Sequence, residues 1–402
     1  MRTSIITAFC SLAVLGCGPG RSSPNVPGPG GYYGQSATPA GGQAQDPRTS
    51  IAMVKVRPPK GIRNAFDAMS RDDDYPPEIR EFARGYAESE WGGSGFVVQD
   101  GSRDGMFRVV TNRHVAAGGE DAQVSFDGGD SFQRAEIAYI SDEVDVAVLL
   151  VNGQHPGFLL GRATEGMPVW AAGYPGLNGK QVWQVTQGNI SNSCLKESSF
   201  IEDAPDRCWF QHTAAIDPGS SGGPLLANGT VVGVNTALLG ERHSMFVAVP
   251  SDHVSNAMRL TNQARANRGD AAWMRAELSR SCRAIFAELT SGSPKFDLIS
   301  SRLSYRLVEN VGIDAVQAVG HPAVMRLFFF DPFRAMQSSL ALVLKQYVAK
   351  RGVVPTEVCQ SINPNDDVLD LTRPVRITLP ADGKPLEASF RFERGAWRLS
   401  DL

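Results

Sequence analysis

The segment Gly219-Ser220-Ser221-Gly222-Gly223-Pro224 decides how this chain is interpreted. Glycine-rich turns let another backbone approach the main chain closely, because glycine carries no Cβ. A peptide carbonyl bound there would lie beside the Ser221 hydroxyl, and the amide groups of Gly219 and Ser221 could converge on the oxyanion formed by its attack. A serine hydroxyl is a weak nucleophile without a base, so the motif predicts a histidine and an orienting carboxylate elsewhere.

Two upstream segments supply these groups. His114 follows the β-branched run Val109-Val110-Thr111 and precedes small residues, which predicts a strand end before a tight turn. Asp145 lies in the apolar segment 144–150, where an unpaired carboxylate is costly to bury and calls for a partner such as the Nδ1–H group of His114. The order His, Asp, Ser along the chain is that of chymotrypsin-like enzymes and differs from subtilisins and α/β-hydrolases.

Over residues 50–255 the chain resembles the HtrA (Deg) subfamily of trypsin-like serine proteases. The segments that carry the resemblance are 93–98, 111–115, 145–149, 172–176, 214–225, 232–236 and 246–252. The resemblance implies a mainly β, chymotrypsin-like double β-barrel, with His114 as general base, Asp145 as its orienter and Ser221 as nucleophile. It also implies an oxyanion hole on the backbone of Gly219 and Ser221. The implied reaction is peptide-bond hydrolysis in proteins or peptides, and it needs no metal ion or other cofactor.

The same residues leave alternatives open. The glycine-rich segment could be an ordinary loop, and Ser220 could be the exposed hydroxyl in place of Ser221. Asp142 competes with Asp145, although it lacks the flanking apolar alternation. A protease fold can also be reused as a binding module. The prediction is therefore a serine endopeptidase, with a non-catalytic envelope scaffold as the alternative.

The chain departs from the family at three points. Thr213 stands where the family usually has an acid, and Ser220 where asparagine is more frequent. Neither position carries the triad, so these two differences bear on loop regulation. The third difference is that no Gly-Leu-Gly-type carboxylate-binding loop is visible in residues 256–402, so no PDZ domain is expected there.

The resemblance also implies a pocket for the residue before the scissile bond. Such pockets are formed by residues shortly before the nucleophile and by the following strand, which assigns the lining to Ala215, Ile216, Val234 and Asn235. None of these residues is a carboxylate that could pair with a buried lysine or arginine side chain. We therefore expect a preference for small or aliphatic residues such as Val, Ala or Leu.

The N-terminal residues read as an export signal. An apolar stretch over 5–15 follows Met1-Arg2 and is too short to span a membrane, which predicts a signal peptide over 1–16. It ends at Val14-Leu15-Gly16-Cys17, which resembles the lipobox of bacterial lipoproteins and implies that Cys17 carries a lipid anchor. An ordinary signal peptide with an incidental Cys17 is the alternative.

Composition and net charge indicate the organisation and the location of the chain. Residues 17–49 are rich in glycine and proline, which predicts a disordered tether between a membrane and the folded part. The chain of 402 residues has a net charge of −3, so no bulk attraction to nucleic acid is expected. Together these features predict a lipoprotein of the bacterial cell envelope, in the periplasm or at the outer membrane, with unknown oligomeric state.

Four of the six cysteines remain after Cys10 and Cys17 are set aside. In an oxidising compartment these four predict two disulfides. The favoured pairs are Cys194–Cys208 and Cys282–Cys359, because each then stays within one domain; two other pairings and four buried thiols remain open. No close Cys/His cluster occurs, so no metal site is expected.

Residues 256–402 change from strand-like to helical periodicity. Apolar residues at helical spacing predict helices over 274–289 and 339–350, and alternation predicts strands over 375–379, 388–392 and 397–399. Helices followed by a strand meander indicate a smaller α+β domain. This order of elements resembles NTF2-like domains. The segment carries no readable chemistry, so its role is not assigned.

Overall fold

The structure is a computed structural model, which describes residues 46–88, 91–101, 104–177, 180–196, 208–238, 245–292, 294, 296–319, 332–353, 359 and 368–402. The predicted signal peptide, Cys17 and almost all of the predicted tether lie outside these residues. Within the described ranges, no helix has the length and apolar composition needed to span a membrane.

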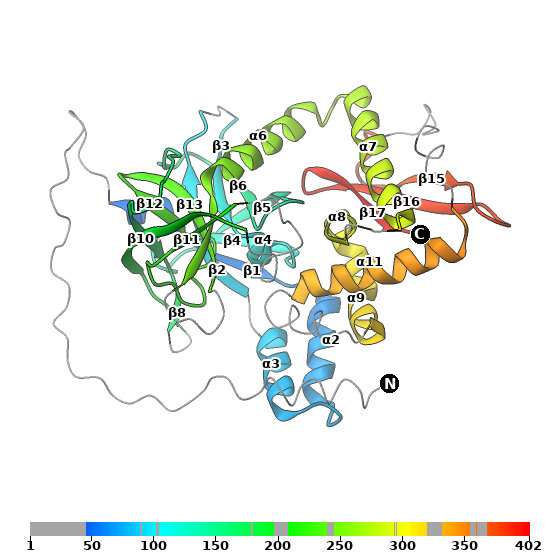
Figure 1. Cartoon of the computed structure of the whole chain (residues 1–402), viewed down its shortest axis with the longest axis horizontal. Coiled ribbons are helices and arrows are strands. Elements are labelled where there is room, and N and C mark those ends of the chain that lie inside the picture. The colour runs from blue at the N-terminus through cyan, green and yellow to red at the C-terminus, as the bar shows by residue number, and fades with distance from the viewer. Residues whose placement is uncertain are drawn as a thin grey trace.

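Two closed six-stranded antiparallel barrels lie side by side (Figure 1). The strands of the first are β1 (Ile51–Arg57), β2 (Trp91–Val98), β3 (Met106–Thr111), β4 (Asp121–Ser125), β5 (Gln133–Ile140) and β6 (Ala147–Asn152). The strands of the second are β7 (Pro168–Gly173), β10 (Gln184–Leu195), β11 (Trp209–His212), β12 (Pro224–Ala227), β13 (Thr230–Leu238) and β14 (Phe246–Pro250). The predicted double β-barrel is confirmed.

Both barrels have the same topology. The first closes in the order β1-β2-β3-β6-β5-β4, and the second in the order β7-β10-β11-β14-β13-β12. The connection after the first strand differs between them. In the first barrel this connection holds the helices α2 (Lys60–Arg71) and α3 (Pro77–Glu88). In the second barrel it holds the small hairpin of β8 (Gly176–Leu177) and β9 (Lys180–Gln181). The short helix η1 (Pro47–Ser50) precedes β1.

Strand β6 shows why some of these strands are apolar at every position. Leu149 and Val151 pack in a core that continues into the C-terminal region, whereas Val148 packs in a second core shared with the other barrel. Successive residues of a strand point to opposite faces, so a strand buried on both faces must be apolar throughout. The residues near Asp145 are therefore apolar because β6 lies between two cores.

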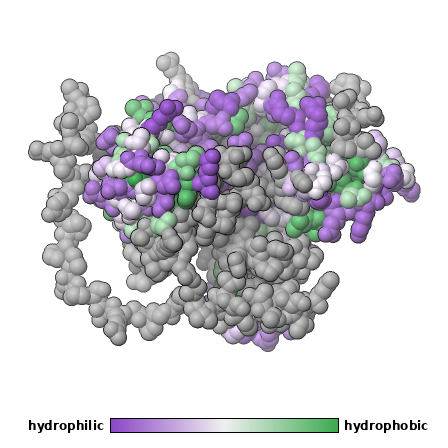
Figure 2. Space-filling model, viewed as in Figure 1, coloured by the Kyte–Doolittle hydropathy of each residue, from purple (hydrophilic) through white to green (hydrophobic). Residues whose placement is uncertain are grey.

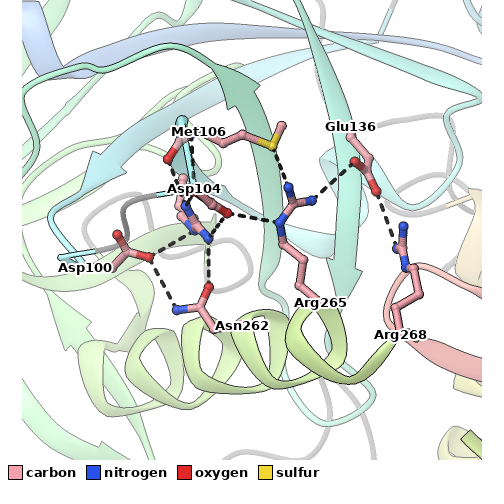
Figure 3. A network of polar contacts seen from close by, with 8 residues as sticks. Asp100, Asp104, Met106, Glu136, Asn262, Arg265 and Arg268 are labelled. Carbon is pink, nitrogen blue, oxygen red and sulfur yellow. Dashed lines mark hydrogen bonds and ion pairs between the residues drawn. The ribbon is translucent and has the colours of Figure 1, made fainter. Parts of the chain in front are cut away.

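Helix α6 (Ser251–Asn267) follows β14 directly and lies against the first barrel. The buried guanidinium of Arg108 on β3 pairs with Asp100 at 3.0 Å and Asp104 at 2.8 Å, and it donates to Asn262 of α6 at 3.0 Å. Further members of this network are Arg265, Arg268 and Glu136 (Figure 3). A buried arginine needs such partners, so the network fixes α6 on the barrel.

The remaining C-terminal region consists of helices and a small sheet, on the opposite side of Figure 1 from the second barrel. The helices are α7 (Ala271–Thr290), α8 (Phe296–Ser301), α9 (Tyr305–Val319) and α11 (Pro332–Lys350), and the strands are β15 (Val375–Leu379), β16 (Leu386–Glu393) and β17 (Ala396–Asp401). The expected smaller α+β region is confirmed. Its core is continuous with that of the first barrel. The face seen in Figure 2 is mostly hydrophilic where described residues are visible.

Candidate functional site

His114 and Asp145 are brought together by two connections of the first barrel. His114 lies on the single helical turn α4 (Arg113–Ala116) just after β3, and Asp145 lies just before β6. The Nδ1 atom of His114 is 2.7 Å from Oδ2 of Asp145, and the His114 amide donates to Oδ1 at 2.9 Å. The carboxylate thus fixes the imidazole from both the ring and the backbone, which leaves Nε2 as the nitrogen available for proton transfer.

Asp145 has further partners inside the protein. The side-chain amide of Asn112 donates to the Asp145 carbonyl at 2.7 Å, and the Thr236 hydroxyl donates to Oδ2. Burial by itself would raise the pKa of Asp145, but the His114 ring, the Arg113 charge and the Thr236 hydroxyl hold this pKa well below its usual value. The carboxylate therefore stays ionised and can stabilise an imidazolium.

Ser221 lies on the β11–β12 connection of the second barrel, and Thr236 links it to the first. The Ser221 hydroxyl donates to the Thr236 carbonyl at 3.2 Å, while the hydroxyl of the same threonine donates to Asp145. The amide of Ser94 on β2 also donates to the Ser221 carbonyl at 2.7 Å. The structure therefore brings all three predicted triad residues to the junction of the two barrels.

The amide groups of Gly219 and Ser221 are directed by their neighbours. The Pro218 carbonyl accepts from the Gly176 amide at 2.9 Å, and the Ser220 carbonyl accepts from the Gly223 amide at 3.0 Å. The C=O and N–H groups of a trans peptide point in opposite directions, so the amides of Gly219 and Ser221 point away from these contacts. Within the described residues neither amide has an acceptor in the protein. Two such donors suit a developing oxyanion.

Glycine is required at two positions of this loop. Gly219 has φ +98°, and a Cβ there would lie 2.9 Å from the Tyr174 carbonyl oxygen. Gly222 has φ +85°, and a Cβ there would overlap the Ser94 carbonyl oxygen at 2.1 Å. Both the backbone conformation and the space therefore exclude other residues.

The alternatives considered from the sequence lie elsewhere. The Ser220 hydroxyl is buried and accepts from the Asp217 amide at 3.3 Å. Asp142 pairs with Arg398 at 3.4 Å and with Arg302 at 3.7 Å, both in the C-terminal region. Neither side chain is bonded to His114 in the described contacts.

A comparison with protein-family models shows which family the two barrels resemble. Residues 93–234 match the trypsin-like peptidase domain. This region is a trypsin-like peptidase domain. It includes His114, Asp145 and Ser221 and thus covers the candidate site.

Curated relatives of the peptidase domain are HtrA-type proteases. The chain is 32% identical over 195 residues to "Protease Do-like 1, chloroplastic" of Arabidopsis thaliana, covering 46% of this chain and 41% of the relative. It is 33% identical over 200 residues to "Probable periplasmic serine endoprotease DegP-like" of Halomonas elongata, covering 46% of this chain and 39% of the relative. The chain thus spans less than half the length of these relatives.

Solved structures are similar at lower identity. The active form of the Rv3671c protease from M. tuberculosis is 24% identical, with a TM-score of 0.40, over 53% of this chain and 81% of that one. The HtrA-type protease AlgW with a tripeptide is 23% identical, with a TM-score of 0.40, over 53% of this chain and 60% of that one.

The residues predicted to line the specificity pocket occupy different environments in the peptidase domain. Ala215 is exposed and Ile216 is buried in the second barrel. Val234 and Asn235 on β13 are fully buried, and the side-chain amide of Asn235 donates to the Pro224 carbonyl at 3.0 Å. This assignment stays a prediction.

Disulfides and metal ligands complete the comparison with the sequence. Cys194 near the end of β10 is bonded to Cys208 just before β11, and Cys282 is bonded to Cys359 in the C-terminal region. Among the described residues, no group of three or more His, Cys, Asp or Glu side chains could hold a metal ion.

Sequence reasoning missed Thr236 and Ser94. Besides its role at Asp145, Thr236 is the acceptor for the Ser221 hydroxyl. The Ser94 hydroxyl accepts from the Tyr174 amide at 2.8 Å and donates to the Gly219 carbonyl at 2.8 Å. Both residues lie in segments that resemble the HtrA family, and this was the only signal that could have pointed to them.

Proposed function

We propose that this chain is a serine endopeptidase in which Ser221 is the nucleophile, His114 the general base and Asp145 its orienter. The observation that carries the proposal is the joint placement of the His114–Asp145 pair, the Ser221 hydroxyl and two amides without protein acceptors. These are the parts that acyl transfer requires. The name of the Halomonas relative, a serine endoprotease, adds support for hydrolysis of peptide bonds.

The proposed reaction has two steps. In the first, the Ser221 Oγ atom forms an ester bond to the substrate carbonyl carbon while His114 takes the hydroxyl proton and passes it to the departing amine. In the second, water attacks the ester and His114 again transfers the proton, which releases the acid and restores Ser221. The amides of Gly219 and Ser221 stabilise the oxyanion in both steps.

Cleavage of unfolded casein by the purified protein tests this proposal. We expect Ser221→Ala to abolish cleavage and Ser220→Ala to retain it, because only the first removes the nucleophile. A fluorophosphonate should add covalently to Ser221 in the native protein, as peptide mapping by mass spectrometry would reveal. Equal cleavage by the native protein and Ser221→Ala would reject the protease, and no cleavage by the native protein would favour a binding scaffold.

We further propose that the protein acts in a bacterial cell envelope and is anchored through lipid on Cys17. The lipobox-like Val14-Leu15-Gly16 and the glycine- and proline-rich segment 17–49 support this location. Periplasmic location is also part of the name of the Halomonas relative. In cells fed labelled palmitate, we expect label in the native protein and none in Cys17→Ser. An unmodified N-terminus at another residue would contradict the anchor.

A further inference from the structure

The tip of the β16–β17 hairpin contacts the segment that carries His114. Arg394 lies at this tip, and its guanidinium donates to the carbonyl of Ala117 and, at 2.5 Å, to that of Gly119. These two carbonyls directly follow α4, whose last turn is closed by the amide of Ala117 on the carbonyl of Arg113 at 2.7 Å. One side chain of the C-terminal region thus bonds to both ends of the segment 117–119, which follows the helical turn that carries His114.

The same hairpin contacts the segment before Asp145. Arg398 on β17 pairs with Asp142 at 3.4 Å and donates to the Ile140 carbonyl at 3.4 Å. Arg113 joins the two segments, since its guanidinium donates to the Val144 carbonyl at 3.4 Å. The His114 and Asp145 segments therefore form one unit, and the hairpin supports it from the side of the C-terminal region.

The backbone at Arg394 is unusual for an arginine. Arg394 has φ +51° and Gly395 has φ +78°, and Glu393 pairs directly with Ala396, so the hairpin has a two-residue turn with both φ values positive. Such turns favour Asn-Gly, Asp-Gly or Gly-Gly, because a left-handed conformation is unfavourable for a long side chain. Strained backbone of this kind persists where the surroundings require it.

The surroundings of Arg394 account for that requirement. The side chain is half-buried and lies over the Tyr305 ring, with the guanidinium carbon 4.5 Å from the ring centroid. The Tyr305 amide in turn donates to Glu393 at 2.7 Å. Burial lowers the pKa of Arg394 to about 10, so the guanidinium keeps its charge at neutral pH. The planar, charged guanidinium of arginine can donate to two carbonyls at once. The shorter side chain of an asparagine in this turn could not reach these two carbonyls.

We propose that Arg394 is a positioning residue for the His114–Asp145 pair, through which the C-terminal region holds the peptidase domain in its competent geometry. This inference rests on the proposed function. Arg394 touches neither substrate nor the triad side chains, so its effect passes through the 117–119 turn. Catalysis depends steeply on the geometry of the base, and displacement by about 1 Å can cost about 100-fold in rate.

The test uses Arg394→Asn, which removes the guanidinium and places a favoured residue in the turn. The hairpin should therefore form at least as well as in the native protein. Arg391→Asn is the matched control, since Arg391 lies on β16 of the same hairpin and, among the described residues, donates only within the C-terminal region, to the Thr372 carbonyl at 3.1 Å. Arg394→Lys keeps the positive charge but loses the planar guanidinium that donates to two carbonyls.

We expect Arg394→Asn to lower kcat about 10- to 100-fold with KM nearly unchanged, and Arg394→Lys to restore part of the loss. Arg391→Asn should match the native protein. The downfield NMR signal of the His114 Nδ1 proton, which reports the bond to Asp145 without any substrate, should shift or broaden in Arg394→Asn alone. Native kcat and a native signal in Arg394→Asn would overturn the inference, as would equal losses in both asparagine variants.

The NMR signal separates this inference from the proposed function. If the native protein cleaves no substrate, the proposed function fails, and the His114 signal alone decides the role of Arg394. An unchanged signal in Arg394→Asn then rejects the positioning role, whereas a changed signal supports it.

Discussion

His114 and Ser221 occupy equivalent places in the two barrels, since each follows the third strand of its barrel, β3 in one and β11 in the other. The two segments are nevertheless held by different means. Side chains of Asp145, Arg113 and Arg394 hold the segment of His114. Backbone bonds, the Ser94 hydroxyl and glycines hold the segment of Ser221. The same topology thus supports one half of the site mainly through side chains and the other half mainly through backbone groups and glycines.

This difference predicts where each half of the site is sensitive to substitution. A loop held through its backbone and glycines fails when one of those glycines is changed. A loop held by distant side chains fails when any of those side chains is lost, even one in the turn between β16 and β17. Substitutions at Asp145, Gly219, His212 and Thr236 test this contrast.

Asp145→Asn should have the largest effect. An asparagine keeps the shape but cannot hold the imidazole in the tautomer that leaves Nε2 as the base, so kcat should fall by about 10⁴-fold. The melting temperature should change far less, since the side chain retains hydrogen-bonding partners. Asp121→Asn, which alters surface pairs with Arg57 and Arg134, is the control. Near-native turnover of casein by Asp145→Asn would remove Asp145 from the triad.

Gly219→Ala tests the half that is held mainly by backbone groups and glycines. The added methyl group would meet the Tyr174 carbonyl oxygen in a backbone conformation that alanine disfavours, so the amide of residue 219 should turn away. Loss of one oxyanion donor costs about 10²- to 10³-fold in kcat. Gly229→Ala is the matched control, because Gly229 also has positive φ but nothing lies within 4 Å of a Cβ there. Equal effects of both changes on kcat would argue against the oxyanion hole.

His212 makes the second barrel sensitive to mild acid. This residue ends β11, and burial lowers its pKa from 6.5 to about 4. Between these values the unfolded chain binds a proton that the folded chain does not, so stability decreases as the pH falls from 6.5 to about 4. At roughly 1.4 kcal/mol per pH unit the loss is about 3 kcal/mol.

Urea unfolding at pH 7 and pH 5 measures the part of this loss that falls above pH 5, about 2 kcal/mol. His212→Phe should remove most of the difference between the two pH values, because phenylalanine does not titrate. Asp145 in the first barrel has a lowered pKa and therefore contributes stability above its ordinary value of 3.8, which is lost only in stronger acid. An unchanged pH dependence in His212→Phe would assign the acid sensitivity to other groups.

Thr236→Val should have the smallest effect of the four. The change removes the hydroxyl that donates to Asp145 but keeps the backbone carbonyl that accepts from Ser221. We expect kcat/KM to fall about tenfold, since a hydrogen bond to a charged group is lost while other donors to Asp145 remain. Thr236→Ser, which retains the hydroxyl, should restore native kcat/KM. A native value in the valine variant would show that this donor is dispensable.

The sequence predicted those parts of the site whose chemistry is local. The glycines around Ser221 indicate a tight loop because their conformational role can be read without knowing the fold. The apolar run around Asp145 indicates burial and hence a partner. The double barrel followed from the resemblance of several such segments, and the α+β character of residues 256–402 followed from a change in periodicity.

The remainder could not be predicted because it depends on contacts between distant segments. Thr236 is an ordinary strand residue until β13 brings its hydroxyl to Asp145, 91 positions away. Arg394 appears in the sequence as a polar residue in a turn, and its two acceptors lie 277 and 275 positions earlier. Only the packing of the two barrels on one another, and of the C-terminal region on the first barrel, reveals these partners.

The position of Arg394 along the chain also has a consequence in time. Synthesis proceeds from the N-terminus, so both barrels, complete at Pro250, are made well before the β16–β17 hairpin. The nascent polypeptide therefore holds the proposed nucleophile and oxyanion site before Arg394, the proposed support of its acid–base pair, has been made. Full competence would come only when this hairpin has packed on the first barrel, which delays cleavage beyond the completion of the two barrels.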